Sequence, residues 1–387
     1  MPLGNREGGC VGREPGDLTA RVVRRAPGLA LGMRKTASGD SKECGRVDQT
    51  AWTSVEQAAR RRARTTTLVL FAVLAMAFVV SLLLGPSNFS PSEIFRGLFD
   101  GQGAAGIVAR ELRLPRAGLA VVVGAALGAS GAALQGLFRN PLAEPGVTGV
   151  TSCAGLGAVV AIYFGLTVAH AFLLPVFAVT GALLSAGILY LLSRRGAGAI
   201  ALVLAGVAVA SLATALTALA LSFARNPYAM ADMVFWMMGS LKDAKPADLY
   251  FSAPLTLAGL LLLLSASRGL NALTLGEEAA RSLGVDVASV RGRVVTGVAL
   301  ATGAATAAAG AVSFVGMVVP HVLRRFYGYE PSRLILPSAL GGAVLVTVAD
   351  VAIRLIAPDG QLLLGVVTAM LGAPFFFWLI LRHRREA

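Results

Sequence analysis

Charged residues are scarce in this chain, and their scarcity excludes a soluble enzyme. Only 14% of the 387 residues are charged and 56% are hydrophobic, whereas a soluble domain carries about 25% charged residues. Length alone favours two or three soluble domains, but the mean hydropathy of +0.71 overrides that expectation. The composition therefore indicates a protein that crosses a membrane many times.

Cysteine and histidine are equally rare. The three cysteines, Cys10, Cys44 and Cys153, are scattered, which argues against a disulfide framework and a zinc site. The three histidines show no ligand spacing, so neither a metal site nor a cofactor is expected. The sequence lacks the phosphate-binding pattern G-x-x-x-x-G-K-[ST], and its apolar segments hold no nucleophile–base pair. These absences exclude an ATPase in this chain and disfavour an intramembrane enzyme.

The formal net charge of +13 invites a nucleic-acid-binding interpretation, but the placement of the charge excludes it. Residues 1–66 hold 13 Lys and Arg against 7 Asp and Glu. Most of the remaining excess lies in short loops between apolar segments, as expected for cytoplasmic loops of a membrane protein. Residues 1–65 lack periodicity and a secretory signal, which predicts a disordered basic extension in the cytoplasm. Met33 is a candidate translation start within it.

Apolar segments of about 20 residues, long enough to cross a bilayer, recur along the rest of the chain. Arginines before the first segment and after the last place both chain ends in the cytoplasm, which requires an even number of crossings. We predict an all-α polytopic membrane protein with a transmembrane domain over 66–382 and a cytoplasmic tail at 383–387. The ten predicted spans cover about 66–84, 116–137, 148–165, 171–192, 198–223, 247–265, 291–311, 313–326, 334–356 and 362–381.

The stretch from Arg110 to Gly149 organises the chain. Its apolar span is dense in Gly, Ala and Ser, and such small residues let membrane helices pack closely. The span beginning VVVGAALGASGAALQGLF is echoed five crossings later by VVTGVALATGAATAAAGAVSF. This echo predicts an inverted repeat that relates spans 2–5 to spans 7–10, an arrangement common in transporters.

Local signals predict three features of the connections. Ser90 is expected to cap a short outer helix with Pro91 at its first position. Residues 225–231 are expected to form an outer loop, with FWMMGSL as a short helix after it. Thr274 and Glu277 match a capping box that would start a short inner helix, ended by Gly284.

Several motifs carry a resemblance to a known family. They are RLPR at 113–116, GAALGASGAALQGLFRNPLAEPGVTG from Gly124, FWMMGSL, LGEEAARSLGV, FVGMVVPHVLRR and the C-terminal VADVAIR…GVVTAMLGAPFFFWLILR. In this order and spacing, over about 110–382, the chain resembles the FecCD-type permeases. These are the membrane subunits of ATP-binding-cassette (ABC) importers for iron–siderophore complexes, haem and vitamin B12.

The resemblance implies a type II importer fold, a place in the bacterial inner membrane and several partners. These partners are two copies of a separate ATPase subunit, a substrate-binding protein and membrane lipid. A path for a haem-sized ligand would not fit within one ten-helix bundle, so a second permease copy, related by a two-fold axis along the path, is also expected.

Three arginines are the expected docking residues for the binding protein. Arg113 and Arg116 belong to the RLPR motif, whose arginines meet glutamates of the binding protein in the resembled family. Arg354 matches a further docking arginine, and Asp350, four residues earlier on the same helix face, is expected to orient it. The alternative is that these arginines reach toward lipid headgroups. On the docking hypothesis, replacing Arg113 and Arg116 by Glu abolishes docking without changing expression.

The inner loop at about 271–289 resembles the coupling helices that contact the ATPase. Its double glutamate makes an amphipathic helix lying on anionic lipid the weaker alternative. The residues expected to contact the ATPase are Glu277, Glu278, Arg281, Leu283, Gly284 and Val285.

Candidate pathway residues lie before and after the fifth span. Phe235, Trp236, Met237 and Met238, after it, could line the outer end of the transport pathway, with helix packing as the equal alternative. The family places its inner gate at the turn that holds Gly198 and Ala199. Some relatives carry hydroxyl residues there, whereas this chain has small apolar ones.

The leading hypothesis is therefore an importer permease for an iron chelate, either a siderophore complex or haem, with vitamin B12 as the alternative cargo. A secondary transporter coupled to ions is the second hypothesis, for which Asp350 is the sole acidic candidate within a span.

Overall fold

A computed structural model describes residues 49–85, 89–101, 103–224, 226–357 and 361–383. The chain forms two units, residues 1–57 and 58–387, and the packing described below is that of the second unit. Every regular element in the described ranges is helical. The elements are α3 (Gln49–Leu83), α4 (Pro91–Asp100), α5 (Gly103–Ile107), the π-helix η1 (Val108–Arg113), α6 (Leu114–Leu137), the 3-10 helix η2 (Pro145–Thr148), α7 (Val150–Tyr163), α8 (Leu166–Ala169), α9 (Leu173–Arg194), α10 (Ala199–Ser222), α11 (Pro227–Met237), α12 (Pro246–Thr274), α13 (Glu277–Ser282), α14 (Val287–Ala309), α15 (Val315–Tyr327), α16 (Pro331–Ile356) and α17 (Leu364–His383).

Each of the ten predicted spans coincides with a helix, which confirms the all-α polytopic fold. Within the described ranges, six helical segments are long and apolar enough to cross a membrane; they lie in α3, α5–η1–α6, α9, α10, α12 and α16. The shorter apolar helices α7 and α17, together with α14 and α15, occupy the other four predicted positions.

Three expected boundaries are wrong. The first helix begins at Gln49 rather than near 66, because Ala58–Arg64 is built from strong helix formers that extend α3. Residues 1–48 of the predicted extension lie outside the described residues. Helix α12 continues to Thr274, about nine residues past the expected end. The expected outer loop after residue 225 is instead the start of α11, which Asn226 caps by accepting a hydrogen bond from the Ala229 amide.

The predicted inverted repeat is visible in the order of helix lengths. Helices α6, α7, α9 and α10 have 24, 14, 22 and 24 residues, and α14, α15, α16 and α17 have 23, 13, 26 and 20. In each half, a long helix is followed by a break and a short helix. The packing repeats as well, because α16 packs on α6 as α9 packs on α14.

Glycines bring α6 into backbone contact with its neighbours. A Cβ atom at Gly124 or Gly128 would overlap the carbonyl groups of Gly342 or Ser338 on α16, and one at Gly131 would overlap Gly316 on α15. The buried face of α6 is therefore set by the absence of side chains, as the small-residue pattern predicts.

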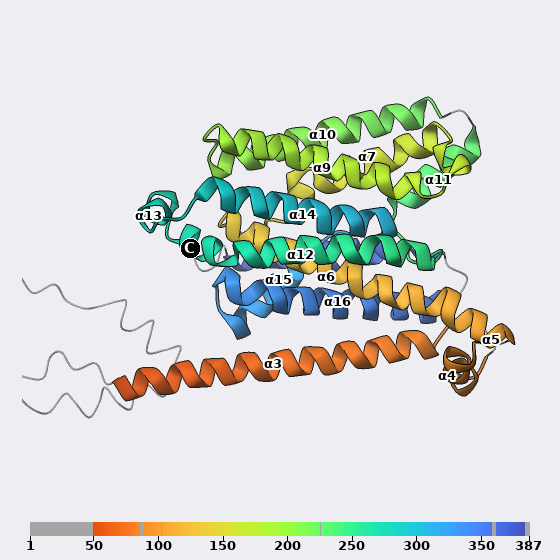
Figure 1. Cartoon of the computed structure of the whole chain (residues 1–387), viewed down its shortest axis with the longest axis horizontal. Helices are drawn as coiled ribbons and strands as arrows, with labels where there is room; N and C mark the ends of the chain where they lie inside the picture. Colours follow the sequence, from red (N-terminus) through yellow and green to blue (C-terminus); the bar gives the residue numbers. More distant parts are fainter. Residues whose placement is uncertain (1–48, 86–88, 102, 225, 358–360, 384–387) are drawn as a thin grey trace, which may run out of the picture. The chain divides into compact units, whose positions relative to one another are not determined.

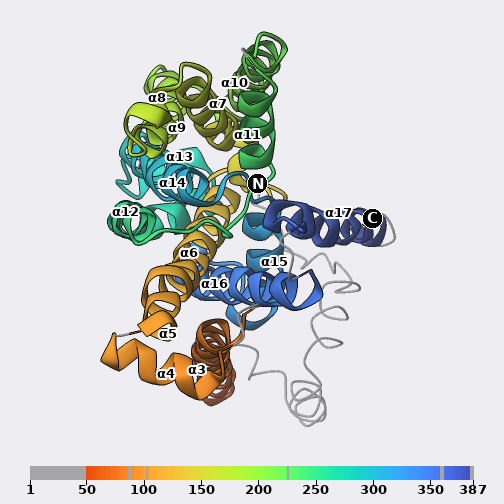
Figure 2. The ribbon, with the colours of Figure 1, turned by 90° about the vertical axis from the view of Figure 1, so that its right-hand side faces the viewer.

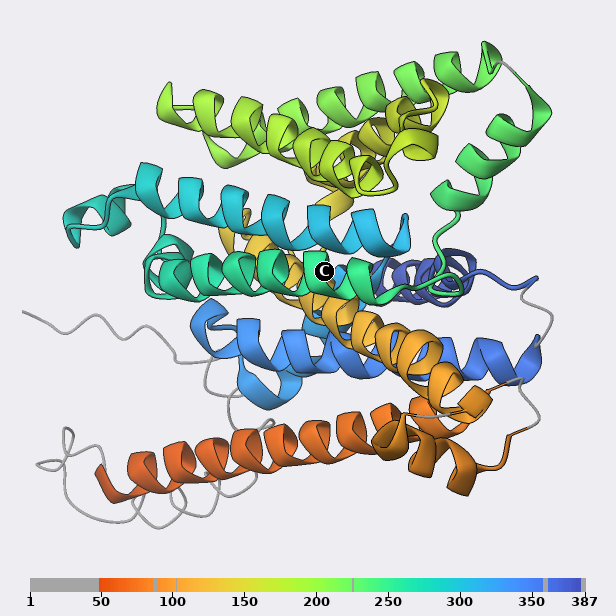
Figure 3. The same cartoon turned by 45° about the vertical axis from the view of Figure 1, so that its right-hand side comes forward.

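The connecting elements gather at opposite ends of the long helices (Figures 1 and 3). Helices α4, α5 and α11 lie at one end, and α13 lies at the other. Helix α17 packs on α15 and α16, to one side of α12 and α14 (Figure 2). The two ends therefore carry different connecting structures, and each holds one group of the predicted site residues.

Helix α4 begins as predicted. Ser90 and Glu93 form a complete capping box, with Pro91 at the first helical position. The hydrogen bond from the Ser90 amide to the Glu93 carboxylate lowers the pKa of Glu93.

Candidate functional sites at the two ends of the bundle

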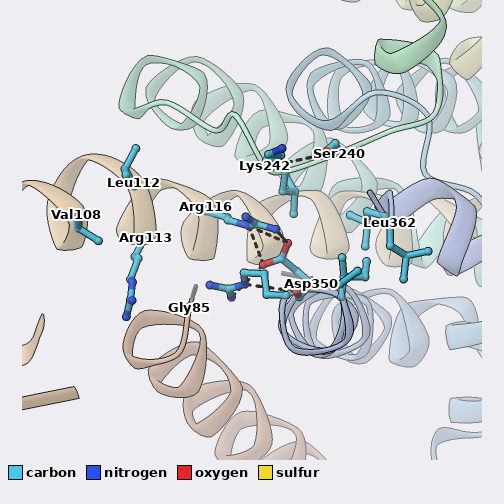
Figure 4. A pocket seen from close by; sticks show the side chains of 14 residues that line it. Gly85, Val108, Leu112, Arg113, Arg116, Ser240, Lys242, Asp350 and Leu362 are labelled. Atoms are coloured by element: carbon cyan, nitrogen blue, oxygen red, sulfur yellow. Dashed lines mark hydrogen bonds and ion pairs between the residues drawn. The ribbon is translucent and has the colours of Figure 1, made fainter. Parts of the chain in front are cut away.

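The end of the bundle that is predicted to face outward holds three arginines, two of which bind one carboxylate (Figure 4). Asp350 of α16 is 1% exposed and accepts hydrogen bonds from Arg116 at 2.8 and 3.0 Å. Its second oxygen lies 3.0 Å from the Arg354 guanidinium, which confirms the expected pairing four residues apart on one helix. Asp350 therefore orients Arg116 on α6 as well as Arg354 on its own helix.

The other contacts of these arginines hold the C-terminal end of α3. Arg354 donates to the Ser81 and Leu84 carbonyl oxygens at 3.0 and 3.1 Å. Arg113 points away from Asp350 (Figure 4) and donates to the Leu82 and Leu83 carbonyls at 3.0 and 2.7 Å. The last carbonyls of a helix lack intrahelical partners and carry partial negative charge. The guanidinium groups of Arg113 and Arg354 thus supply hydrogen-bond donors to the carbonyl groups at the end of α3.

A cavity of about 260 Å³ opens beside this cluster. Arg113 and Arg354 are only 5% and 8% exposed at its wall, whereas Arg116 is partly exposed and Lys242 is exposed. The structure thus brings the three predicted docking arginines together, but it leaves mainly Arg116 and Lys242 accessible. Lys242 was missed because a lysine just after a helix carries no distinctive pattern. The lining residues are Gly85, Val108, Leu112, Arg113, Arg116, Ser240, Leu241, Lys242, Asp350, Ile353, Arg354, Ala357, Leu362 and Leu364.

The opposite end, which is predicted to face the cytoplasm, presents the short helix α13. Leu283, directly after it, is 65% exposed, and Gly284 ends it with φ +79, as predicted from the left-handed conformation that glycine favours. Glu278 and Arg281 are exposed, and Glu277 and Val285 are partly exposed. A projecting apolar side chain beside charged ones is a surface suited to a protein groove.

The predicted capping box at Thr274 is wrong. Helix α12 includes Thr274, whose hydroxyl donates to the Asn271 carbonyl at 2.6 Å. Gly276 is the N-cap of α13 and supplies no side-chain hydrogen bond. Helix α14 begins three residues after Gly284, where the Asp286 carboxylate caps the amides of Ala288 and Ser289.

The candidate pathway residues are divided between the two ends. Phe235 and Met238 of the α11 region are 62% and 42% exposed, whereas Trp236 and Met237 are partly buried. The last turn of α11 touches the breaks near Gly239 and Gly310, since a Cβ at Gly310 would overlap the Trp236 carbonyl. The candidate gate residues Gly198, the N-cap of α10, and Ala199 lie at the other end of that helix.

A third buried arginine lies at the α13 end, where sequence reasoning had found none. Arg291, in the first turns of α14, is 4% exposed and forms an ion pair with Glu277 of α13. Within the described ranges, no group of three or more His, Cys, Asp or Glu side chains is arranged to hold a metal ion.

Comparison with known proteins places these features in a family. The model of the FecCD transport family matches residues 73–382. The hemin transport system permease protein HmuU of Yersinia pestis is 38% identical over 324 residues, which cover 80% of this chain and 95% of HmuU. The vitamin B12 import system permease protein BtuC of Escherichia coli O9:H4 is 38% identical over 322 residues, which cover 82% of this chain and 95% of BtuC.

A solved structure gives the same result for the fold. An inward-facing metal-chelate type ABC transporter superposes with a TM-score of 0.72 at 30% identity, over 81% of this chain and 98% of that one. Similarity over nearly the whole length of these proteins means that the match includes both ends of the bundle.

Proposed function

The chain belongs to the FecCD transport family, and on that premise we propose that it is the membrane-spanning permease of an ABC importer for an iron chelate. The observation that carries the proposal is the placement of α13. This helix, with the exposed Leu283 beside it, stands at the opposite end of the bundle from α4 and α5 (Figure 1). The arginine cluster lies at the α5 end, where η1 and the start of α6 follow α5. A permease needs one face for an ATPase and another for cargo delivery.

ATP hydrolysis belongs to separate subunits, two copies of which contact the permease pair. Leu283 and Val285 enter an apolar groove of the ATPase, and Glu277, Glu278 and Arg281 meet its rim. Gly284 sets the turn that lets Leu283 project. The α13 end and both chain ends therefore lie in the cytoplasm of a bacterial cell, with the basic extension at 1–65 and the tail at 383–387 on that side.

The substrate-binding protein docks at the opposite end through carboxylates. Arg116 and Lys242 meet these carboxylates directly, whereas Arg113 and Arg354 reach them after a small local rearrangement or act by fixing α3 and α16. The support for this division is the exposure of each side chain, together with the hydrogen bonds that hold Arg113 and Arg354 to α3. A basic docking surface steers an acidic partner and fixes its orientation.

The cargo passes between two copies of this permease. Phe235, Trp236, Met237 and Met238 line the outer part of the path, and the turn with Gly198 and Ala199 closes its inner part. A haem or a ferric siderophore is the proposed cargo. Vitamin B12 is the alternative, because relatives named for hemin and for vitamin B12 are equally similar to this chain.

A secondary transporter finds less support. Its ion-coupling candidate, Asp350, is 1% exposed and bound by two guanidinium groups. Both of its oxygens are occupied by guanidinium groups, which leaves the carboxylate poorly placed to bind a transported ion.

The experiment that tests the function is reconstitution. The permease is placed in proteoliposomes with the ATPase subunit and binding protein encoded beside it, and uptake of haem, ferrichrome and cyanocobalamin is measured with and without ATP. We expect ATP-dependent uptake of one iron chelate. Uptake of cyanocobalamin alone would select the alternative cargo, and uptake driven by an ion gradient without ATP would reject the importer.

A further inference from the structure

The buried side chain of Arg291 connects three segments at the inner end of the bundle. Arg291 lies on α14, one of its guanidinium nitrogens pairs with a Glu277 carboxylate oxygen of α13, and another donates to the Ala197 carbonyl at 3.0 Å. Ala197 belongs to the turn between α9 and α10, next to the candidate gate residues. One side chain thus touches both the proposed ATPase contact and the proposed gate.

The two partners of Arg291 lie on short segments bounded by glycines. Helix α13 is flanked by Gly276 at φ +111 and Gly284 at φ +79, and Ala197 is flanked by Gly196 at φ +86 and Gly198. Arg291 itself is fixed on a 23-residue helix. Segments that end in glycine can rotate as units at little steric cost. The contacts therefore link two movable segments through a rigid one.

Breaking the contact between Arg291 and Glu277 is costly because the guanidinium is buried. Arg291 is 4% exposed, so separating it from Glu277 would leave a desolvated charge without its partner. The planar guanidinium also binds its two acceptors at a fixed angle, which a lysine ammonium cannot reproduce. The other carboxylate oxygen of Glu277 lies 3.7 Å from Arg281, which extends the contact to the rim of α13.

A cavity of about 340 Å³ beside this contact gives the segments room to move. It is bounded by both segments and by α14, through Ser193, Gly196, Arg281, Val285, Asp286 and Arg291. A tightly packed junction would resist displacement, whereas this one combines a specific polar link with open space.

We propose that Arg291 is a positioning residue that ties the place of α13 to the place of the α9–α10 turn. A displacement of α13 by the ATPase then pulls Ala197 with it and changes the opening of the turn. This inference rests on the proposed function, in which α13 contacts the ATPase and the turn closes the path.

The experiment measures coupling in the reconstituted complete importer, as cargo molecules transported per ATP hydrolysed. The cargo is whichever of haem, ferrichrome or cyanocobalamin the unmodified complex transports. The variants are Arg291→Gln, Arg291→Lys and Glu277→Gln. The matched control is Arg293→Gln, which removes an arginine two residues further along α14 that donates to the Ser265 and Ser289 carbonyls instead.

We expect Arg291→Gln to assemble with the ATPase and to retain at least half of its activity, and we expect cargo transported per ATP to fall about tenfold in Arg291→Gln and in Glu277→Gln. Arg291→Lys should lie between these variants and the unmodified protein, and Arg293→Gln should match the unmodified protein. Combining Arg291→Gln with Glu277→Gln should lower the ratio no further, because both remove the same link.

Two results would overturn the proposal. One is a ratio within twofold of the unmodified protein in Arg291→Gln. The other is loss of assembly in both Arg291→Gln and Arg291→Lys, which would assign Arg291 a purely structural role. Absence of ATP-dependent uptake by the unmodified complex would instead reject the proposed function, so the two failures are distinguishable.

Discussion

At the residue scale, Asp350 decides what the outer arginines can do. It pairs with both Arg116 and Arg354 within a buried site, and Arg354 also holds the end of α3 through the Ser81 carbonyl. Charges within membrane protein are tolerated when they pair with one another or with carbonyl groups. The cluster is therefore part of the fold as well as a candidate docking surface.

Replacing Asp350 by Asn tests this structural role. The change leaves the Arg116 and Arg354 guanidinium groups without their counter-charge, and breaking a buried pair in this way costs about 3–5 kcal/mol. We expect the purified permease in detergent to unfold at a clearly lower temperature. The control is Glu330→Gln, since Glu330 and Arg333 are both 53% exposed and an exposed pair is worth about 1 kcal/mol or less. Equal effects of the two substitutions would contradict the role of Asp350.

The hydrogen bonds of Arg113 affect how a loss of docking in the double substitution of Arg113 and Arg116 by Glu is interpreted. Arg113 donates to the Leu82 and Leu83 carbonyls, so a glutamate there would face them with its own negative charge. Loss of docking in that variant would combine a direct effect with detachment of α3. Lys242→Glu, which changes an exposed side chain at the same cavity, separates the two.

At the element scale, glycine positions decide how closely α6 and α16 approach. Gly128 faces the backbone of α16 directly, because an added Cβ would overlap the Ser338 carbonyl. Gly187 on α9 has open space around its Cβ position. Gly128 is therefore required for close helix packing and Gly187 is not, although both lie within apolar helices.

Alanine substitutions at Gly128 and Gly187 test this difference. Gly128→Ala forces α6 away from α16, and such overpacking costs about 1–3 kcal/mol. Gly187→Ala meets no neighbour and favours the helix by about 0.5–1 kcal/mol. Thermal unfolding of the two variants in detergent should move in opposite directions, and a loss of the same size in both would show that α6 and α16 are not packed as described.

Sequence patterns predicted the elements better than the contacts between them. Hydropathy located a helix at each of the ten predicted span positions, and spacing of four residues predicted the Asp350–Arg354 pair, because both signals are local. The pair of Arg116 with Asp350 is 234 residues apart in the chain, and its existence depends on how α6 and α16 are placed by their glycines. The Arg291–Glu277 pair is close in sequence but depends on the fold of the turn between them.

Errors in the boundaries have a similar origin. The ends of α12 and α3 lie outside the apolar segments, where hydropathy no longer marks the helix. The extension of α12 is supported by tertiary contacts instead, since Asn271 exchanges hydrogen bonds with Ser332 at the start of α16. In α12, propensity alone did not separate the polar helical turns at 266–274 from a loop.

At the scale of the whole molecule, the account depends on the polarity of the bundle. The arginine cluster and α4 mark one end, and α13 marks the other. The inverted repeat gives the two halves opposite directions, so each end combines connections from both halves. Delivery of cargo and contact with the ATPase require that these ends face opposite sides of the membrane.

Site-directed labelling tests this polarity most directly. Single cysteines replace the exposed Ser92 on α4 or Ser282 on α13, in a chain whose three native cysteines are changed to Ala. Intact spheroplasts are treated with a membrane-impermeant maleimide before and after permeabilisation. The account predicts that Ser92→Cys is labelled in intact spheroplasts and that Ser282→Cys is labelled only after permeabilisation. Labelling of both positions from the same side would contradict it.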